Sequence, residues 1–319
     1  MAAVGMPMGE ESVVRVLVTG AAGYVGSAVV AALARAGHEP VALRHRAATP
    51  TWPGVRARVG DLLEPGPLVQ AVTGVDAVCH LAGLGRARQS WDEPLRYFQV
   101  NADGTRALLA AMESAGVERF VFASTASIYG APRDQPITED LPDDPPHPYA
   151  ASKAAAEAVI EWQARTGRLR AVVLRLFNAA GGSDADPSRL IPRVLAVAAG
   201  EAPSLEVNGD GSARRDYLHV DDAAGAFAAA VDHAPPAGRI RRYNIGSGLG
   251  SSVLDVVGVA ERVAGRPIRV VHRAPVAEPP VLVCDPGRAL AELGWKPARS
   301  ELDTIVRDAW AARPARQRG

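Results

Sequence analysis

The sequence predicts an α/β fold in which a parallel, doubly wound sheet is followed by a smaller C-terminal lobe. Short apolar runs alternate with helical patterns through the first half of the chain, as in successive strand–helix–strand units. The first run, at residues 13–18, leads directly into a glycine-rich turn and an alanine-rich helical stretch at 27–36. From residue 178 onward, glycine and proline interrupt the alternation, which indicates a lobe folded over the sheet.

The other elements of the sheet are expected in chain order. We expect further strands at 41–43, 55–59, 76–81, 119–123 and 169–176, and helices at 95–114 and 149–166. The proline-rich, acidic segment 128–147 is expected to be a surface excursion.

Composition excludes several classes of protein. With 319 residues the chain can form a large α/β unit plus a smaller lobe. Basic and acidic residues balance at 35 each, which argues against nucleic acid or an anionic membrane as a partner. We expect no membrane span, because no run of about 18 apolar residues occurs. Residues 1–12 lack the pattern of a signal peptide and are expected to be a loose leader. Cys79 and Cys284 stand far apart in apolar contexts, which indicates buried thiols in a reducing cytoplasm and no disulfide.

The glycine-rich turn carries the first chemical signal. Gly20, Gly23 and Gly26 are spaced G-x-x-G-x-x-G, one residue looser at the start than the usual Rossmann fingerprint. Glycines there permit a tight turn and a close approach of the main chain, so that a pyrophosphate can sit at the helix N-terminus. Between a strand and a helix, this loop predicts dinucleotide binding.

A tyrosine and a lysine four residues apart carry the second signal. Tyr149 and Lys153 share one face of the expected helix, so the phenol and the ammonium can point into the same pocket. A nearby cation favours phenolate and lowers the tyrosine pKa toward the working pH. Such a tyrosine can take a proton from a hydroxyl, or return one to a carbonyl, near neutral pH.

Further motifs follow in a fixed order along the chain. They are Gly60-Asp61-Leu62, His80-Leu81-Ala82-Gly83, Asn101 in the run 101–105, the run 124–130, Arg175-Leu176-Phe177-Asn178, the run 215–222 and the run 244–248. With these motifs the chain resembles the extended short-chain dehydrogenase/reductases, and within them the UDP-galactose 4-epimerase-like nucleotide-sugar enzymes. The resemblance runs from about Val13 to about Gly248.

The resemblance implies roles for individual residues. Tyr149 would be the base toward the sugar 4-hydroxyl, and Lys153 would grip the nicotinamide ribose and acidify Tyr149. Thr125 would bridge the sugar oxygen to the tyrosine, with Ser124 as the alternative, and Asn101 would help to order the helix that carries Lys153. The cofactor-binding residues that we infer are Gly20, Gly23, Tyr24, Val25, Gly26, Arg44, Asp61, Leu62, Leu81, Ala82, Gly83, Asn101, Ser124, Tyr149, Lys153 and Phe177. The inferred substrate-binding residues are Thr125, Tyr149, Asn178, Arg215 and Arg273.

The resemblance also implies partners and domains. The substrate would be a nucleotide sugar, with a UDP-sugar as the expected class, and the protein would be a homodimer formed through the helices at 95–114 and 149–166. We divide the chain into the leader at 1–12, an NAD(P)-binding Rossmann domain at 13–177 and a nucleotide-sugar-binding lobe at 178–319. Segments around 218–247 are expected to return to the Rossmann domain.

The residues after Thr125 bear on the reaction. Sugar 4,6-dehydratases place an acid directly after this threonine, whereas Ala126 and Ser127 stand here and cannot protonate a leaving hydroxyl. Dehydration is therefore disfavoured. Reversible oxidation at a ring carbon remains, with the hydride either returned to the opposite face or exchanged with an external donor.

The identity of the cofactor stays open at this point. Relatives that bind NAD place an aspartate after the second strand, where it bonds the adenosine ribose. Here Arg44 stands at that position, with Arg46 close by, and an arginine could instead meet the 2′-phosphate of NADP or stack on adenine. Near the C-terminus, Arg273 is the candidate to replace an arginine that grips the nucleotide in relatives.

Three functions follow from these alternatives. A nucleotide-sugar 4-epimerase is the first, an NAD(P)H-dependent nucleotide-sugar 4-ketoreductase is the second, and a non-enzymatic NAD(P) sensor is the third. No metal site is expected: His80 is interpreted as structural, and the pair Asp221 and Asp222 as a helix N-cap.

Overall fold

The computed structural model describes residues 13–45, 52–276 and 278–314. The leader at 1–12 and Arg46 lie outside the described residues. The strands are β1 (Arg15–Thr19), β2 (Glu39–Arg44), β3 (Arg56–Val59), β4 (Ala77–His80), β5 (Arg119–Thr125), β6 (Arg170–Leu176), β7 (Asn178–Ala180), β8 (Leu205–Asn208), β9 (Arg214–His219), β10 (Arg239–Ile245), β11 (Gly250–Ser252), β12 (Val270–Arg273) and β13 (Val281–Leu282). The helices are α1 (Tyr24–Arg35), α2 (Pro65–Val72), α3 (Pro94–Phe98), α4 (Gly104–Ala115), α5 (Pro148–Arg165), α6 (Leu190–Ala198), α7 (Val220–Asp232), α8 (Val253–Ala264), α9 (Gly287–Leu293) and α10 (Leu302–Ala312), with short turns η1 (Gln89–Trp91), η2 (Gln99–Asp103) and η3 (Ala126–Tyr129).

Seven strands form one parallel sheet in the order β10-β6-β5-β4-β1-β2-β3. The strand order reverses between β1 and β4, so the carboxyl ends of these two strands flank the position where such sheets bind ligands. The predicted doubly wound α/β fold is confirmed, and each strand expected in the first half of the chain is present within a few residues of its expected bounds.

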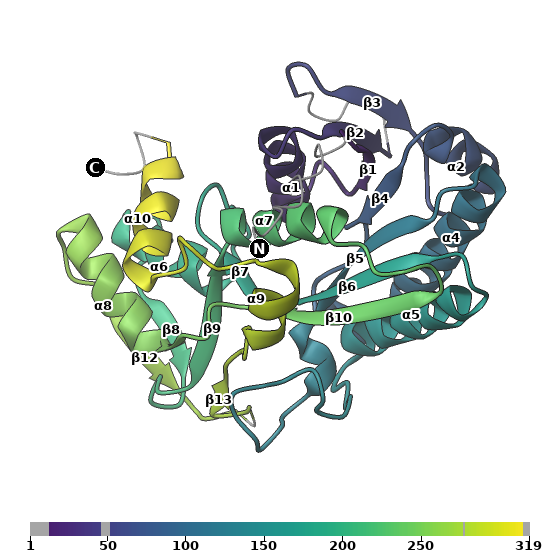
Figure 1. Cartoon of the computed structure of the whole chain (residues 1–319). Coiled ribbons are helices and arrows are strands. Elements are labelled where there is room, and N and C mark those ends of the chain that lie inside the picture. Colours follow the sequence, from purple (N-terminus) through teal and green to yellow (C-terminus); the bar gives the residue numbers. More distant parts are fainter. Residues whose placement is uncertain (1–12, 46–51, 277, 315–319) are drawn as a thin grey trace, which may run out of the picture.

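Helices cover both faces of the sheet, as Figure 1 shows. Helices α1 and α7 pack together on one face, and α2, α4 and α5 lie on the other. Each face has its own apolar core, built from alternate residues of the same strands: Val16 and Val18 point into the first core and Leu17 into the second. Strand β10 pairs with β6 in this sheet and helix α7 packs on it, although both follow β7, β8 and β9 in the chain.

The C-terminal part of the chain adds a separate packing unit. Helices α6, α8 and α10 pack with one another around a third apolar core, which Val194, Val256 and Ile305 help to form. Its strands form two small sheets, one with β7, β9, β11 and β13 and one with β8 and β12. Within the described residues, no helix is both long and apolar enough to cross a membrane.

The helix expected at 95–114 is interrupted. Two α-helical segments, α3 and α4, are separated by the π-helical turn η2. Asn101, at the centre of this turn, donates to Ser152 and exchanges two hydrogen bonds with the main chain of Leu84. These contacts come from distant parts of the chain, and a π-turn inside a helix often marks a functional position.

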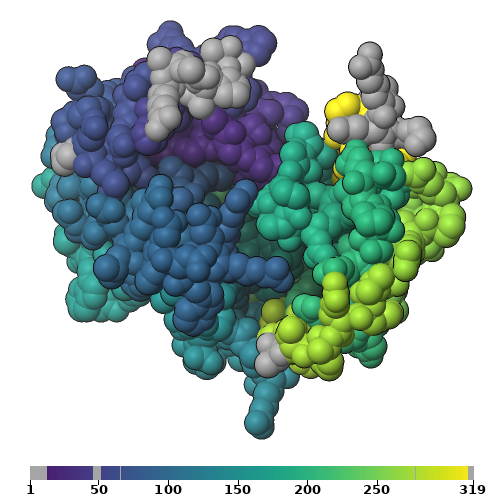
Figure 2. Space-filling model, turned by 180° about the vertical axis from the view of Figure 1, so that it is seen from behind, coloured from purple at the N-terminus to yellow at the C-terminus, as the bar shows by residue number. Residues whose placement is uncertain are grey.

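A hollow separates the two packing units on one face of the molecule. In Figure 2 it lies between the blue part of the chain and the green-to-yellow part. Arg86 and Asp186 form an ion pair from opposite sides (3.7 Å), and a small cavity of about 220 Å³ is lined by Arg88 on one side and by Ser188 and Glu206 on the other.

Candidate active site

The glycine loop forms a tight turn between β1 and α1. Gly20 has a φ of +69°, and a Cβ there would lie 2.6 Å from the main-chain nitrogen of Ala82. A Cβ on Gly26 would lie 2.1 Å from the carbonyl oxygen of Gly20. Gly23 is the N-cap of α1, and no side chain of the described residues caps that helix. The loop therefore offers bare main chain and a helix N-terminus, which fits the pyrophosphate of a dinucleotide.

Tyr24 and Val25 begin helix α1 and have different surroundings. Val25 packs against the first apolar core. The Tyr24 hydroxyl donates to the carbonyl oxygen of Gly181 (2.6 Å), and the Arg189 guanidinium lies 5.3 Å from the Tyr24 ring centre. The glycine loop is thereby tied to the segment that leads into α6.

The loop after β4 lies directly beside the glycine loop. The main-chain N–H groups of Leu81 and Ala82 both donate to Thr19 Oγ1 (3.1 Å each). Gly83 lies so close to Asn101 that a Cβ on Gly83 would be 2.7 Å from Asn101 Oδ1. Leu81, Ala82 and Gly83, which we expected to line the cofactor, therefore lie where the strand order of the sheet reverses, between β1 and β4.

His80 is fully buried between two threonines. Thr105 donates its hydroxyl proton to the carbonyl oxygen of Asn101 (2.6 Å), so His80 Nε2 is the donor toward Thr105 (3.1 Å). His80 Nδ1 then accepts from Thr19 (2.7 Å). Burial lowers the pKa of His80 to about 3, so its role in this structure is that of a neutral structural link.

Arg44, Asp61 and Leu62 lie together at the ends of β2 and β3. The Gly60 N–H donates to the Arg44 carbonyl oxygen (3.0 Å), which holds the two strand ends side by side. Asp61 Oδ2 is 3.1 Å from Nε2 of His45, and Leu62 is buried. The structure therefore places a guanidinium and a carboxylate at the edge where the adenosine of a dinucleotide is expected.

Tyr149 lies in the first turn of α5, and Thr125 ends β5. Thr125 is within hydrogen-bonding reach of the Tyr149 hydroxyl, and this contact and the charge of Arg189 lower the pKa of Tyr149. Burial acts more strongly in the opposite direction, so the net pKa of Tyr149 is raised. Arg189 was not found from the sequence, because nothing in its local pattern distinguishes it from a surface arginine.

Lys153 is 5 % exposed and follows Tyr149 by one helical turn. Its Nζ donates to the carbonyl oxygen of Ala123 (2.9 Å) and lies 4.6 Å from the ring centre of Phe122. Burial lowers the pKa of Lys153 to about 8, while the charge of Glu157 acts in the opposite direction. We expected Lys153 to lower the pKa of Tyr149. In the structure the groups that lower this pKa are Thr125 and Arg189, and burial of the phenol outweighs both.

Asn101 links the π-turn to the helix that carries Lys153. Its Nδ2 donates to Ser152 Oγ (2.9 Å) and to the carbonyl oxygen of Leu84 (3.0 Å), and its Oδ1 accepts from the Leu84 N–H (2.8 Å). Ser152 precedes Lys153 in α5. These contacts agree with the expectation that Asn101 helps to order this helix.

Ser124 belongs to a buried ionic cluster behind the site. Its hydroxyl donates to Glu157 Oε1 (2.5 Å), and Arg175 binds both oxygens of Glu157 (3.1 and 2.8 Å). Arg175 also binds both oxygens of Asp143 (2.7 and 3.0 Å), and Arg242 donates to Glu157 (3.0 Å). Because the Ser124 proton is engaged in this cluster, Thr125 supplies the hydroxyl beside Tyr149.

The sequence analysis missed Glu157 as part of the site. A signal was present, since Glu157 follows Lys153 by four residues and therefore lies on the same buried helix face. A carboxylate on such a face requires a buried partner. That partner is Arg175, which was noted only as part of a motif.

Phe177, Asn178 and Arg215 lie where the sheet meets the C-terminal unit. Phe177 is buried, and Asn178 Nδ2 donates to the carbonyl oxygen of Asp216 (2.9 Å). Arg215 Nη2 lies 2.6 Å from Glu278 Oε2, so its guanidinium is oriented by a carboxylate. Asn178 and Arg215 are thus on neighbouring strands, β7 and β9.

Arg273 has a different environment. It ends β12, in the sheet that contains only β8 and β12, and forms an ion pair with Glu206. Its side chain is 57 % exposed.

The aspartate pair at the start of α7 differs from expectation. The N-cap is His219, whose Nδ1 accepts from the Asp221 N–H (3.1 Å), so neither aspartate is the cap. Asp222 instead accepts from the N–H groups of residues 298 and 299 (3.0 and 2.8 Å) and from the Ser300 hydroxyl (2.6 Å). No group of three His, Cys, Asp or Glu residues suited to a metal occurs within the described ranges.

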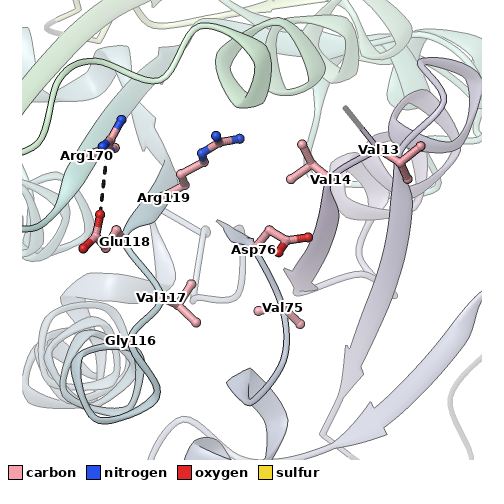
Figure 3. Close-up of a pocket in the computed structure, with 9 residues that line it drawn as sticks. All are labelled: Val13, Val14, Val75, Asp76, Gly116, Val117, Glu118, Arg119 and Arg170. Atoms are coloured by element: carbon pink, nitrogen blue, oxygen red, sulfur yellow. Dashed lines mark ion pairs between the residues drawn. The ribbon is translucent and has the colours of Figure 1, made fainter. Parts of the chain in front are cut away.

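A larger cavity lies at the opposite end of the sheet. It measures about 440 Å³ and is lined by Val14, Asp76, Glu118, Arg119 and Arg170, among others. Figure 3 shows these residues at the amino ends of β1, β4, β5 and β6, with Glu118 and Arg170 paired at 3.7 Å. Ligands of parallel sheets bind at the carboxyl ends, so this cavity is separate from the site described above.

Fold and glycine loop together define a Rossmann-type dinucleotide-binding protein. The chain belongs to the NAD dependent epimerase/dehydratase family, whose profile matches residues 16–246. This confirms the resemblance inferred from the motifs.

Individual relatives cover nearly the whole chain. A UDP-glucose 4-epimerase from Streptomyces lividans is 41 % identical over 313 residues, which span 92 % of this chain and 94 % of the relative. The crystal structure of a UDP-glucose 4-epimerase from Brucella ovis in complex with NAD has a TM-score of 0.87 at 35 % identity and covers 92 % of this chain and 97 % of its own. A UDP-glucose 4-epimerase from Stenotrophomonas maltophila with bound NAD and formylated UDP-arabinopyranose also has a TM-score of 0.87, at 32 % identity, over 94 % of this chain and 97 % of its own.

Proposed function

We propose that this protein is a nucleotide-sugar 4-epimerase that acts on UDP-sugars with bound NAD. The observation that carries the proposal is the arrangement around Tyr149, where Thr125 reaches its hydroxyl and Lys153 follows one helical turn later. The activity named for the relatives from S. lividans, B. ovis and S. maltophila supports the same function.

The residues of the chain divide the work of such a reaction. Arg215, held by Glu278, would bind the diphosphate with its planar guanidinium, and Asn178 would orient the sugar. Tyr149 would take the proton of the sugar 4-hydroxyl. It would return this proton after the keto sugar has rotated in the site to present its opposite face. Thr125 would stabilise the phenolate by hydrogen bonding. Bound NAD would supply the hydride acceptor and a positive charge near the phenol.

Cofactor binding would use the main chain more than side chains. The glycine loop and the first turn of α1 would hold the pyrophosphate, and the loop 81–83 would line the nicotinamide side. Lys153, directed toward the Ala123 carbonyl oxygen at the end of β5, would hold the nicotinamide ribose. Arg44 beside Asp61 leaves NADP as the alternative cofactor, and with it a 4-ketoreductase that releases the cofactor in each turnover.

The absence of an acid after Thr125 separates epimerisation from dehydration. Thr125 Oγ1 accepts from the Ser127 N–H (3.2 Å), and the turn η3 that follows begins with Ala126. Ala126 has no acidic group and the Ser127 hydroxyl is too weak an acid to protonate a leaving hydroxyl, so the proposal is an epimerase within a family that also contains dehydratases.

One experiment tests this function directly. The purified protein is denatured and the released nucleotide identified, and the native protein is then incubated with UDP-glucose or UDP-galactose without added cofactor. We expect bound NAD and interconversion of the two sugars. Turnover that requires added NADPH and a 4-keto sugar would instead establish the ketoreductase.

We further propose a homodimer located in the cytoplasm. Free, buried Cys79 and Cys284 suit a reducing compartment.

Large apolar side chains are exposed on the helical surface around α3 and α5: Leu95 is 84 % exposed and Trp162 is 69 % exposed. Such side chains are common at subunit interfaces.

Replacing Trp162 by Glu tests the dimer. We expect the wild-type protein to sediment as a dimer and the variant to dissociate at least about tenfold more readily, because a charge would be buried in an apolar interface. Leu290→Glu, on α9, is the matched control, since Leu290 is also exposed and apolar but lies on another helix. A wild-type protein that is monomeric at micromolar concentration would contradict the proposal.

A further inference from the structure

His147 stands at the start of the helix that carries Tyr149 and Lys153. It is the N-cap of α5, and its Nδ1 accepts a hydrogen bond from the Ala150 N–H (3.1 Å). The usual N-cap residues are Ser, Thr, Asp and Asn, so a histidine cap is unusual. Because Nδ1 is the acceptor, the imidazole is neutral and carries its proton on Nε2.

The same imidazole also packs against the phenol of the site. The rings of His147 and Tyr149 are stacked, with centres 5.8 Å apart and planes 14° apart. Tyr97 of α3 contacts Tyr149 edge-on, with ring centres 6.4 Å apart, and is itself fixed by a hydrogen bond from its hydroxyl to the Arg86 carbonyl oxygen (2.8 Å). The Tyr149 ring therefore has an aromatic neighbour on its face and another meeting it at 75°.

We propose that His147 is a positioning residue for Tyr149, and that it holds the phenol in place only while its imidazole is unprotonated. The inference rests on the proposed function, which assigns the proton transfer to Tyr149. Protonation would put an N–H on Nδ1, opposite the Ala150 N–H, and the cap would be lost. It would also place a positive charge at a helix N-terminus, where the helix dipole disfavours it.

The surroundings of His147 favour the neutral form. Burial lowers the pKa of His147, and a hydrogen bond within its own residue acts in the opposite direction. Tyr97 on α3 and Arg189 at the start of α6 are titratable groups that act on Tyr149. Asp143, on the loop that leads to His147, is engaged by Arg175.

Two substitutions separate the cap from the ring contact. His147→Asn keeps a cap acceptor that does not titrate but removes the stacked ring, whereas His147→Ala removes both. At pH 8 we expect kcat for the 4-epimerisation to fall about two- to threefold in the Asn variant and about tenfold in the Ala variant, with KM within about twofold in both. His233→Asn, at an exposed histidine after α7, is the matched control and should behave like wild type.

The pH profile provides the readout that a purely structural role would not change. As the pH falls below the ordinary histidine range, wild-type kcat should decline, and the ratio of the Asn variant to wild type should rise. The result that overturns the inference is a wild-type kcat in the Ala variant, or coincident pH profiles for wild type and Asn. If the Ala variant does not fold, the Asn profile alone decides.

Stability measurements distinguish this inference from the proposed function. A histidine whose folded-state pKa is lowered contributes stability above its unfolded pKa and loses it as the pH falls through the folded value. The Tm of wild type should therefore drop toward acid more steeply than that of His147→Asn, and equal slopes would refute the cap. This result does not depend on epimerase activity, whose absence in the wild type would refute only the proposed function.

Discussion

Tyr149→Phe is expected to reduce turnover of UDP-sugars by about 10³-fold, within the range of effects for loss of a general acid–base group. The substitution removes only the hydroxyl that Thr125 reaches and leaves the ring between His147 and Tyr97. Fold and bound nucleotide should be retained. The measurement is kcat of the purified variant together with the amount of nucleotide released on denaturation.

Tyr97→Phe is the matched control for this experiment. It also removes one phenolic hydroxyl from an aromatic residue of the same cluster, but that hydroxyl is bonded to the Arg86 carbonyl oxygen rather than directed to Thr125. We expect a change of at most about threefold. Full activity in Tyr149→Phe would mean that another group transfers the proton.

Gly26→Ala is expected to abolish tight cofactor binding. The new Cβ would lie 2.1 Å from the Gly20 carbonyl oxygen, a distance that main-chain atoms must move to relieve. Overpacking of this kind costs about 1–3 kcal/mol, which corresponds to about 5–150-fold in nucleotide affinity when the displaced loop is the binding loop. The variant should purify with little bound nucleotide and regain activity only with excess NAD.

Gly66→Ala controls for the effect of adding a methyl group to a helical glycine. Gly66 lies in α2, and a Cβ there would have no neighbouring atom within 4 Å. Alanine also favours helix more than glycine, so stability should stay the same or rise slightly. Nucleotide retention in Gly26→Ala equal to that in Gly66→Ala would show that the loop does not hold the cofactor.

The sequence was most informative where local pattern and tertiary fold agree. The run 13–18, the glycine loop and the following helix could be predicted because strand, turn and helix signals are all local. Tyr149 and Lys153 were found for the same reason, since their spacing alone places them on one face of α5.

Contacts between distant residues explain what the sequence could not predict. The π-turn at Asn101 depends on Leu84 and Ser152, and the local helical pattern shows none of this. The direction in which the pKa of Tyr149 shifts could not be predicted from its spacing to Lys153. It depends on burial of the phenol and on Arg189 from the C-terminal unit. The N-cap at His147 could not be predicted either, because the proline and aspartate residues of that segment indicate only a loop.

The late return of β10 to the sheet has a consequence for synthesis of the chain. Strand β10 pairs along its whole length with β6 and ends at residue 245 of 319, after β7, α6, β8 and β9 of the C-terminal unit have been made. On a ribosome, chains generally fold in domains from the N-terminus. Here β6 remains an unprotected edge until β10 emerges, so the nascent chain exposes a strand that invites pairing with other chains. Truncation before residue 239 is therefore expected to yield an aggregating fragment instead of a smaller nucleotide-binding domain.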